Sequence, residues 1–306
     1  MRGTPEIVVR HKPTQIRQLR GGMWVVVALG SEPLVTDRAI AEALRDPRSV
    51  QDTSPLGALA ETLTVAGFMD ISAAASPRPP AAPSSAGWRI ARALLWALGA
   101  ALFSTSAVLL LDGGLPTGSD VISAGEHPVI VVAVAVGIAI AIAAPHELAH
   151  VIFGRTIGRR RGSVRLQPGR ASATTELTHV WAWPSSARLA AVSAGIVVDL
   201  VFLTAALAWR ATTGSWGATV AVAVMAARVV WQLRFHRNCD GRHIAKMLID
   251  SPTVDADTKR ALTTRRWSAP RSTWLWLALA SAGVLAELSL FAIWVVPAAL
   301  RLVGLL

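Results

Sequence analysis

The chain has 306 residues, of which 53% are hydrophobic and 16% charged, so its composition is not that of an ordinary soluble domain. The formal net charge is +11, but the basic residues stand between apolar blocks, which argues against a nucleic-acid-binding protein. The single cysteine excludes an intrachain disulfide and a cysteine-rich zinc ribbon, so a metal site must use His, Asp and Glu. The expected fold class is mainly α, a polytopic membrane helical bundle.

Residues 1–71 are predicted to form a small α+β domain ahead of the membrane part. Glu6–Val9 and Met23–Leu29 are β-branched runs, which is typical of strands. A first helix is expected to begin with an N-cap at Thr36, and a second is expected over residues 54–67, with Pro inside its start and Gly after its end. The first residues contain no apolar signal segment, so we expect this domain to stay in the cytoplasm.

Residues 72–87 are rich in Ala, Ser and Pro, and we expect them to be a flexible linker to a membrane domain over residues 88–306. A helix needs about 20 apolar residues to cross the hydrocarbon core of a bilayer. Five blocks of the sequence are candidate spans, the fourth of them short, and the apolar tail through residue 306 leaves a sixth open. The blocks are Trp88–Leu111, Pro128–Phe153, Leu189–Trp209, Ala218–Trp231 and Trp274–Trp294.

The charges between these blocks indicate how the chain is oriented. Residues 112–127 contain three acidic residues and no Lys or Arg, whereas residues 154–188 contain seven Arg and residues 234–271 contain nine Lys or Arg. Cytoplasmic loops of membrane proteins carry the excess of Lys and Arg. With a cytoplasmic amino terminus, the pattern predicts a multi-pass protein of the bacterial plasma membrane. Whether it forms a homo-oligomer is left open by the sequence.

The segment most informative about function is His146-Glu147-Leu148-Ala149-His150, in the second span. Residues four apart share one face of a helix, so both imidazoles can bind one zinc ion while Glu147 acts as general base on a metal-bound water. The alternative is a pair of interfacial histidines satisfied by hydrogen bonds. Two imidazoles and a carboxylate inside an apolar span are costly unless they are paired or bound to metal. The motif therefore predicts a Zn²⁺ site.

Zinc in a catalytic site takes a third protein ligand and keeps a fourth position open for water. Asp240 is the main candidate, because it follows the fourth span on the side where the second span ends; the alternative is an Asp that caps a helix. His236, His243 and Cys239 are weaker candidates. Asn238 is expected either to donate a hydrogen bond to a bound peptide or oxyanion, or to serve only the loop structure.

Further charges lie within the spans, where a partner or water is normally required. Asp199 and Glu287 can each face the zinc cavity, and for Glu287 an interhelical hydrogen bond is the alternative. Arg228 is expected to snorkel toward the cytoplasmic end of its span. Residues 162–177, with a turn at Pro168-Gly169, are either a membrane-dipping hairpin that binds an extended peptide or a solvated loop.

Three parts of the sequence together resemble the site-2 protease family of intramembrane zinc metalloproteases. They are His146–His150 in a membrane span, Ser193–Asp199 in the next span, and Asn238–Gly241 after the fourth span. The resemblance covers about residues 125–250. It implies zinc ligands at His146, His150 and Asp240, with Glu147 as the base and Asp199 at the site. The chain departs from the family pattern by lacking a proline between Asn238 and Asp240, by Cys239 before the Asp, and by Ile196 after Gly195.

Residues 1–71 are more weakly similar to PqqD-like winged-helix domains, which recognise leader peptides of ribosomally made natural products. The combination resembles the peptide zinc metalloproteases found with such pathways. It implies a hydrolase that cuts a membrane-associated or ribosomally made peptide, for leader removal or maturation. The alternative is a non-catalytic export or immunity component with a structural metal. Glu147 favours the enzyme, because a structural site needs ligands but no base.

Overall fold

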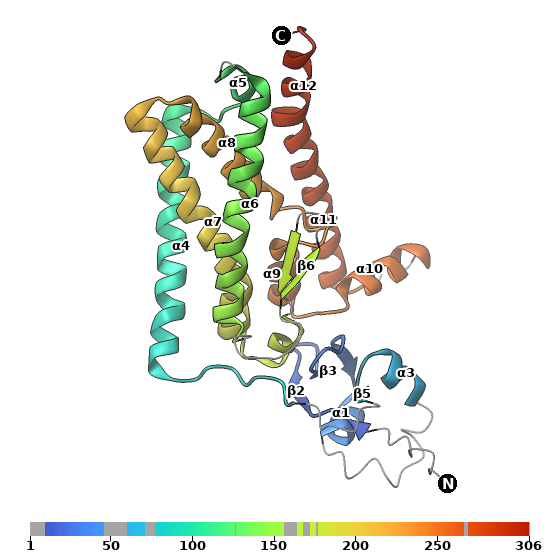
Figure 1. Ribbon diagram of the computed structural model, residues 1–306. Coiled ribbons are helices and arrows are strands. Elements are labelled where there is room, and N and C mark those ends of the chain that lie inside the picture. The colour runs from blue at the N-terminus through green and yellow to red at the C-terminus, as the bar shows by residue number, and fades with distance from the viewer. Residues whose placement is uncertain are drawn as a thin grey trace, which may run out of the picture.

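The computed structural model is mainly helical, with long helices side by side and a small strand-containing part at one end (Figure 1). This confirms the expected mainly α class. The structure describes residues 10–45, 60–70, 77–125, 127–155, 164–167, 172–175, 177–265 and 269–305.

The amino-terminal part contains a three-stranded antiparallel sheet in the order β2-β3-β4, in which Trp24 lies opposite both Gln18 and Thr36. A separate pair of short strands, β1 and β5, joins the two ends of this part. Its elements are β1 (Arg10–His11), β2 (Thr14–Gln18), β3 (Trp24–Ala28), β4 (Leu34–Thr36), α1 (Arg38–Arg45), α3 (Ala60–Val65) and β5 (Met69–Asp70).

The predicted strand at residues 23–29 is confirmed as β3, whereas β2 and β4 were not predicted. The first helix is present, but its cap is Asp37, whose Oδ1 accepts a hydrogen bond from the Ile40 amide. Thr36 instead ends β4. The second helix ends at Val65 before Gly67 (φ +81°), as expected. Its expected start and the predicted strand Glu6–Val9 lie outside the described residues.

The two faces of β3 are buried in different places. Val26 and Ala28 belong to the core of the amino-terminal part, together with Phe68, while Val25 and Val27 pack in a cluster with Trp181. Because side chains alternate across a strand, one strand can bury both faces in this way. The amino-terminal part is therefore packed directly against the membrane part.

Residues 77–85, in the second half of the predicted linker, run along both parts. Three proline carbonyls in this segment accept hydrogen bonds from three side chains that are far apart in the sequence. The bonds are Gln15 Nε2 to Pro79 (2.8 Å), Trp183 Nε1 to Pro80 (2.8 Å) and Arg92 Nη1 to Pro83 (3.0 Å). Ser85 then caps the first long helix, so the last two residues of the predicted linker are helical.

Four helices are long and apolar enough to cross a membrane, and a fifth, α8, has 16 residues. The apolar tail extends the last span, which runs as one 32-residue helix. The spans are α4 (Ala86–Gly113), α6 (Pro128–Phe153), α7 (Ser185–Thr213) and α11–η4–α12 (Arg271–Leu302); the shorter elements of this part are α5 (Gly118–Ser123), η3 (Thr178–Ala182), α8 (Trp216–Trp231), α9 (Asp240–Ile249) and α10 (Val254–Thr263).

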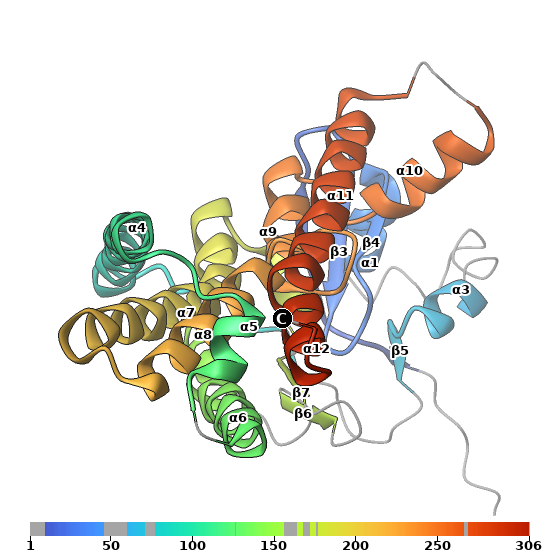
Figure 2. The same ribbon diagram turned by 90° about the horizontal axis from the view of Figure 1, so that it is seen from above.

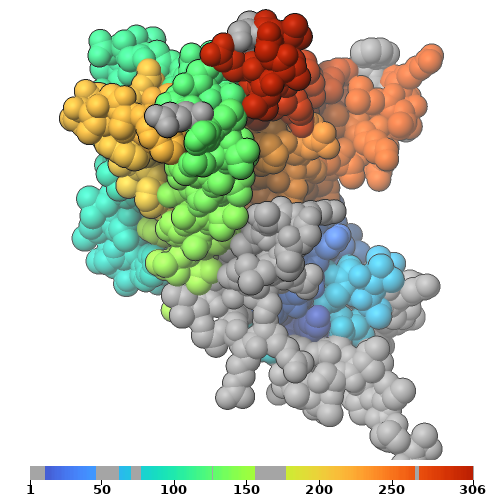
Figure 3. Space-filling view, turned by 45° about the horizontal axis from the view of Figure 1, so that its top comes forward, coloured from blue at the N-terminus to red at the C-terminus, as the bar shows by residue number. Residues whose placement is uncertain are grey.

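Helix α7 is the centre of the bundle, with α4, α6 and α8 packed around it (Figures 1 and 2). Small residues along α7, such as Ala190, Ala194 and Gly195, let the neighbouring helices approach closely. In the most apolar 18-residue window of α7, 56% of the residues are buried inside the protein, against 11% in α4 and in α6. The surface that α4 and α6 leave exposed is apolar, which suits contact with lipid. The outer surface of α6 is visible in the space-filling view (Figure 3).

The predicted hairpin is present as the antiparallel strands β6 (Val164–Gln167) and β7 (Ser172–Thr175). Strand β7 packs against α6. The turn expected at Pro168-Gly169 lies outside the described residues. The backbone pairing confirms a hairpin in this segment, and its membrane-dipping, peptide-binding role stays a prediction.

Candidate metal centre

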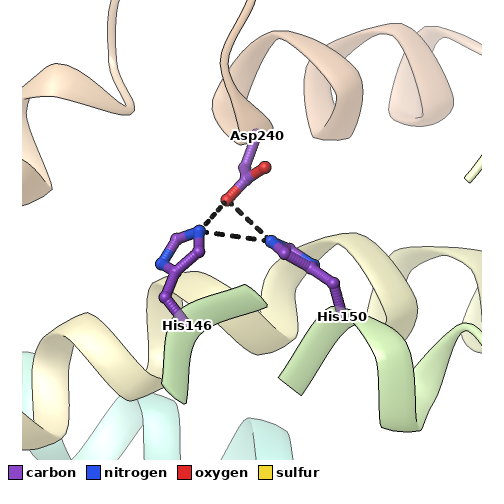
Figure 4. Close-up of side chains that lie close together, drawn as sticks. All are labelled: His146, His150 and Asp240. Carbon is purple, nitrogen blue, oxygen red and sulfur yellow. Dashed lines mark hydrogen bonds and ion pairs between the residues drawn. The ribbon is translucent and has the colours of Figure 1, made fainter. Parts of the chain in front are cut away.

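Two buried histidines lie one turn apart near the end of α6, and a carboxylate from α9 faces them (Figure 4). The Nε2 atoms of His146 and His150 are 3.2 Å apart. Oδ2 of Asp240 lies 3.0 Å from the first and 3.1 Å from the second. Among the described residues, these three form the group that could hold a metal ion. The structure thereby brings together the three predicted ligands, although His150 and Asp240 are 90 positions apart.

Helix α7 fixes the orientation of both imidazoles. Nδ1 of His146 lies 3.1 Å from Asp199 Oδ2, and Nδ1 of His150 lies 2.9 Å from the carbonyl oxygen of Ala191. Each acceptor favours the tautomer in which Nδ1 carries the proton and donates it. The lone pairs of both Nε2 atoms are then directed at the space next to Asp240, as metal binding requires.

The carboxylate of Asp199 is fully buried, and Arg228 on α8 neutralises it. Nε and Nη2 of Arg228 donate to Asp199 Oδ1 at 3.2 and 3.0 Å, while the other oxygen faces His146. The expectation that Arg228 snorkels is wrong, because its guanidinium is directed inward to this ion pair. An unpaired carboxylate would be costly at this position, which explains why the arginine lies within a span.

Gly195 on α7 leaves room for the two imidazoles. A Cβ at this position would lie 2.5 Å from Nε2 of His150 and 2.6 Å from Nε2 of His146, closer than carbon and nitrogen can approach. Any side chain here would therefore enter the space between the ligands. Gly195 lies in the segment that carries the family resemblance, but the chemistry of side chains does not single it out, because glycine offers no ligand atom.

The loop between α8 and α9 places Asp240. The amide of Asp240 donates to Oε1 of Gln232 at 3.1 Å, and Gly241 packs so tightly on the Gln232 carbonyl that a Cβ would collide with it. Cys239 is the N-cap of α9, so Asp240 is the first residue of the helix. The side chain of Asp240 faces the two histidines.

The donor set suits zinc. Tetrahedral zinc with bonds of about 2.0–2.1 Å holds neighbouring ligand atoms roughly 3.3 Å apart. The separations of 3.0–3.2 Å among the two nitrogens and the oxygen are close to that value. Two neutral imidazoles and one carboxylate also match the ligand types of catalytic zinc sites, which leave one position open.

The remaining predicted residues lie outside this triangle of ligand atoms. Asn238 is exposed, and its Oδ1 lies 3.1 Å from Nε2 of His243. Nε2 of His236 lies 2.6 Å from Glu287. The thiol of Cys239 donates to the carbonyls of Gln232 and Arg234, at 3.4 and 3.5 Å. In these contacts His236, His243 and Cys239 bind groups other than the three ligand atoms, and Glu287 on α11 contacts the loop that leads to Asp240.

Glu147 follows His146 directly in the sequence of α6 and is partly buried. Asp199 lies at the site as the partner of His146. The sequence does not indicate two further site residues: Arg228, which binds Asp199, and Gln232, which binds the amide of Asp240.

No protein-family model, curated protein or solved structure matches the chain.

Proposed function

We propose that the chain is an intramembrane zinc metalloprotease. The observation that carries this proposal is the buried triangle of His146 Nε2, His150 Nε2 and Asp240 Oδ2, built on a helix that is long and apolar enough to span a membrane. Glu147 supports a catalytic rather than a structural site, because a structural metal needs no base beside its ligands.

Bound zinc would polarise the scissile carbonyl and lower the pKa of a coordinated water toward about 7. Glu147 would accept a proton from that water as its oxygen bonds to the carbonyl carbon. The same carboxylic acid would then give the proton to the amide nitrogen as the carbon–nitrogen bond breaks. Asp199 would keep His146 oriented throughout, with its own charge balanced by Arg228.

The proposed substrate is a membrane-associated or ribosomally made peptide, cut for leader removal or maturation. We propose a winged-helix-like, PqqD-like role for the amino-terminal part, which would recruit the peptide on the cytoplasmic side. Its three-stranded antiparallel sheet with flanking helices supports this assignment. In this proposal five helices cross the bacterial plasma membrane, α8 being the short one, and nucleic acid is not a partner.

Peptide profiling by mass spectrometry tests the activity in the native host. Cells carrying the intact gene are compared with cells carrying Glu147→Gln at equal expression. We expect a peptide fragment that depends on Glu147, because loss of a general base slows such a reaction by about 10²–10⁴-fold. The ends of the fragment would identify both the substrate and the bond that is cut.

Zinc content of the purified proteins is the control for this comparison. Glu147→Gln should retain zinc, whereas His146→Ala and Asp240→Ala should lose it. Full zinc in the Asp240 variant would contradict the proposed ligand set. Matching peptide profiles, with zinc bound in both proteins, would instead favour a structural metal in an export or immunity protein.

A further inference from the structure

The metal ligand Asp240 is the member of the triangle that does not lie on α6. Its position depends on residues 232–239, the loop between α8 and α9 that precedes it. This loop is held at its far side by α11, the first part of the last span. The carboxylate of Glu287 on α11 binds three side chains of the loop, two arginines and one histidine.

The contacts of Glu287 are specific. Its Oε1 lies 3.3 Å from Nη1 of Arg234, and its Oε2 lies 2.6 Å from Nε2 of His236 and 3.3 Å from Nε of Arg237. Arg234 is also stacked on the ring of Trp231, with 3.1 Å between its Cζ and the ring centroid. One carboxylate therefore binds three loop residues that lie within the six positions before Asp240.

One turn earlier on α11, Gly283 lets the loop backbone approach the helix. A Cβ at Gly283 would lie 2.5 Å from the amide nitrogen of Phe235 and 3.0 Å from Nδ1 of His236. Phe235 itself packs with Trp276 of α11 in a small apolar cluster. The loop thus packs on one surface of α11, which is formed by Trp276, Gly283 and Glu287.

From this surface the loop leads directly to the ligand. The Cys239 thiol binds the carbonyls of Gln232 and Arg234, and the Asp240 amide binds the Gln232 side chain. A displacement of the loop on α11 would therefore move the Asp240 carboxylate relative to the two histidines. Groups that hold a metal ligand in place commonly contribute 10–100-fold to metal affinity.

We propose that Glu287 is a positioning residue for Asp240, so that the last membrane-spanning helix sets the geometry of the metal centre. This inference rests on the proposed metal site. Glu287 does not touch the metal in this proposal; it acts through Arg234, His236 and Arg237 on the loop.

The test measures zinc affinity of the purified full chain in detergent, by competition with a chelator, together with the visible absorption spectrum of the Co²⁺ form. Glu287→Gln should weaken zinc binding by about tenfold or more and change the cobalt spectrum. The matched control is Asp255→Asn, which removes a carboxylate that binds Arg242 and Lys246 on α9.

A second pair of variants covers the case in which Glu287→Gln fails to fold. His236→Gln keeps a donor for Glu287 and should bind zinc nearly as the unmodified chain does, whereas His236→Leu should lose affinity in the same direction as Glu287→Gln. Unchanged affinity in Glu287→Gln or His236→Leu would overturn the inference, and so would an equal loss in Asp255→Asn. Absence of zinc binding by the unmodified chain would instead refute the metal site itself, and the inference with it.

Discussion

Gly195 shows how a residue without a functional group can decide whether the site exists. The substitution Gly195→Ala would place a methyl group within 2.6 Å of both ligand nitrogens, so the imidazoles would have to separate. We expect zinc affinity to fall by about 100-fold or more, since ligand positions must be kept within a fraction of an ångström. Isothermal titration with zinc on the purified protein measures this.

Gly137→Ala is the matched control for this prediction. Gly137 lies on α6, the helix that carries both histidines, and a Cβ there would meet nothing within 4 Å. The control should therefore bind zinc as the unmodified chain does. Normal affinity in Gly195→Ala would show that the histidines are not held where the contacts with Asp240 place them.

Helical periodicity in the sequence predicts those site residues that lie close together along one helix, and it does not predict pairs that come from different helices. His146 and His150 are four apart on one helix, so helical periodicity alone places them together. Asp199 and Arg228 are 29 positions apart on different helices, and their pairing depends on how α7 and α8 pack. Local patterns carry no information on such packing, which is why the sequence alone predicts a snorkelling side chain at Arg228.

At the scale of elements, long apolar blocks were predicted well, because crossing a bilayer imposes both a length and a composition. The start of α6 at Pro128 and its end at Phe153 coincide with the prediction. The amino-terminal strands β2 and β4 were not predicted, because each is short and contains polar residues. Their pairing with β3 supplies the stability that their own sequences do not indicate.

The proposed orientation of the helices gives a prediction at this scale. Asp112 at the end of α4 and Lys259 on α10 are both exposed and lie on opposite sides of the membrane in our proposal. After Cys239→Ser, a cysteine introduced at position 112 should react with a membrane-impermeant maleimide in intact spheroplasts. A cysteine at position 259 should react only after permeabilisation. Labelling in the reverse order would refute a cytoplasmic amino terminus, and equal labelling from one side would refute the number of crossings between them.

On the scale of the whole molecule, the amino-terminal part and the membrane part share one buried ion cluster. Oδ1 of Asp250, which follows α9, accepts from Arg17 on β2 at 2.8 Å and from Arg188 on α7 at 2.7 Å. Its other oxygen accepts from the backbone amide of Arg20 at 2.9 Å. The side chains of Asp250 and Arg188 are 2% and 1% exposed, so the charges depend on one another.

Asp250→Asn tests whether this cluster holds the two parts together. Asn tolerates the positive φ of 63° at this position, so the change removes charge without straining the backbone. It leaves Arg188 buried without its counter-ion, which typically costs about 3–5 kcal/mol. We expect faster hydrogen exchange of the β2 and β3 amides, measured by mass spectrometry. The control Glu42→Gln breaks an exposed pair with Arg38 and should change stability by less than about 1 kcal/mol.

The pH dependence of the unmodified chain follows from the same carboxylate. Burial raises the pKa of Asp250, but the hydrogen bonds from Arg17 and Arg20 and the charge of Arg188 lower it further, so its pKa in the folded protein is below the ordinary value. The stabilisation is then complete above the unfolded pKa of about 3.9 and is lost as the pH falls through the lower, folded value. Exchange protection of β3, corrected for intrinsic rates, should thus be constant from about pH 7 to pH 5 and fall only below about pH 4. A loss of protection already near pH 6 would mean that a histidine, rather than Asp250, controls the contact between the two parts.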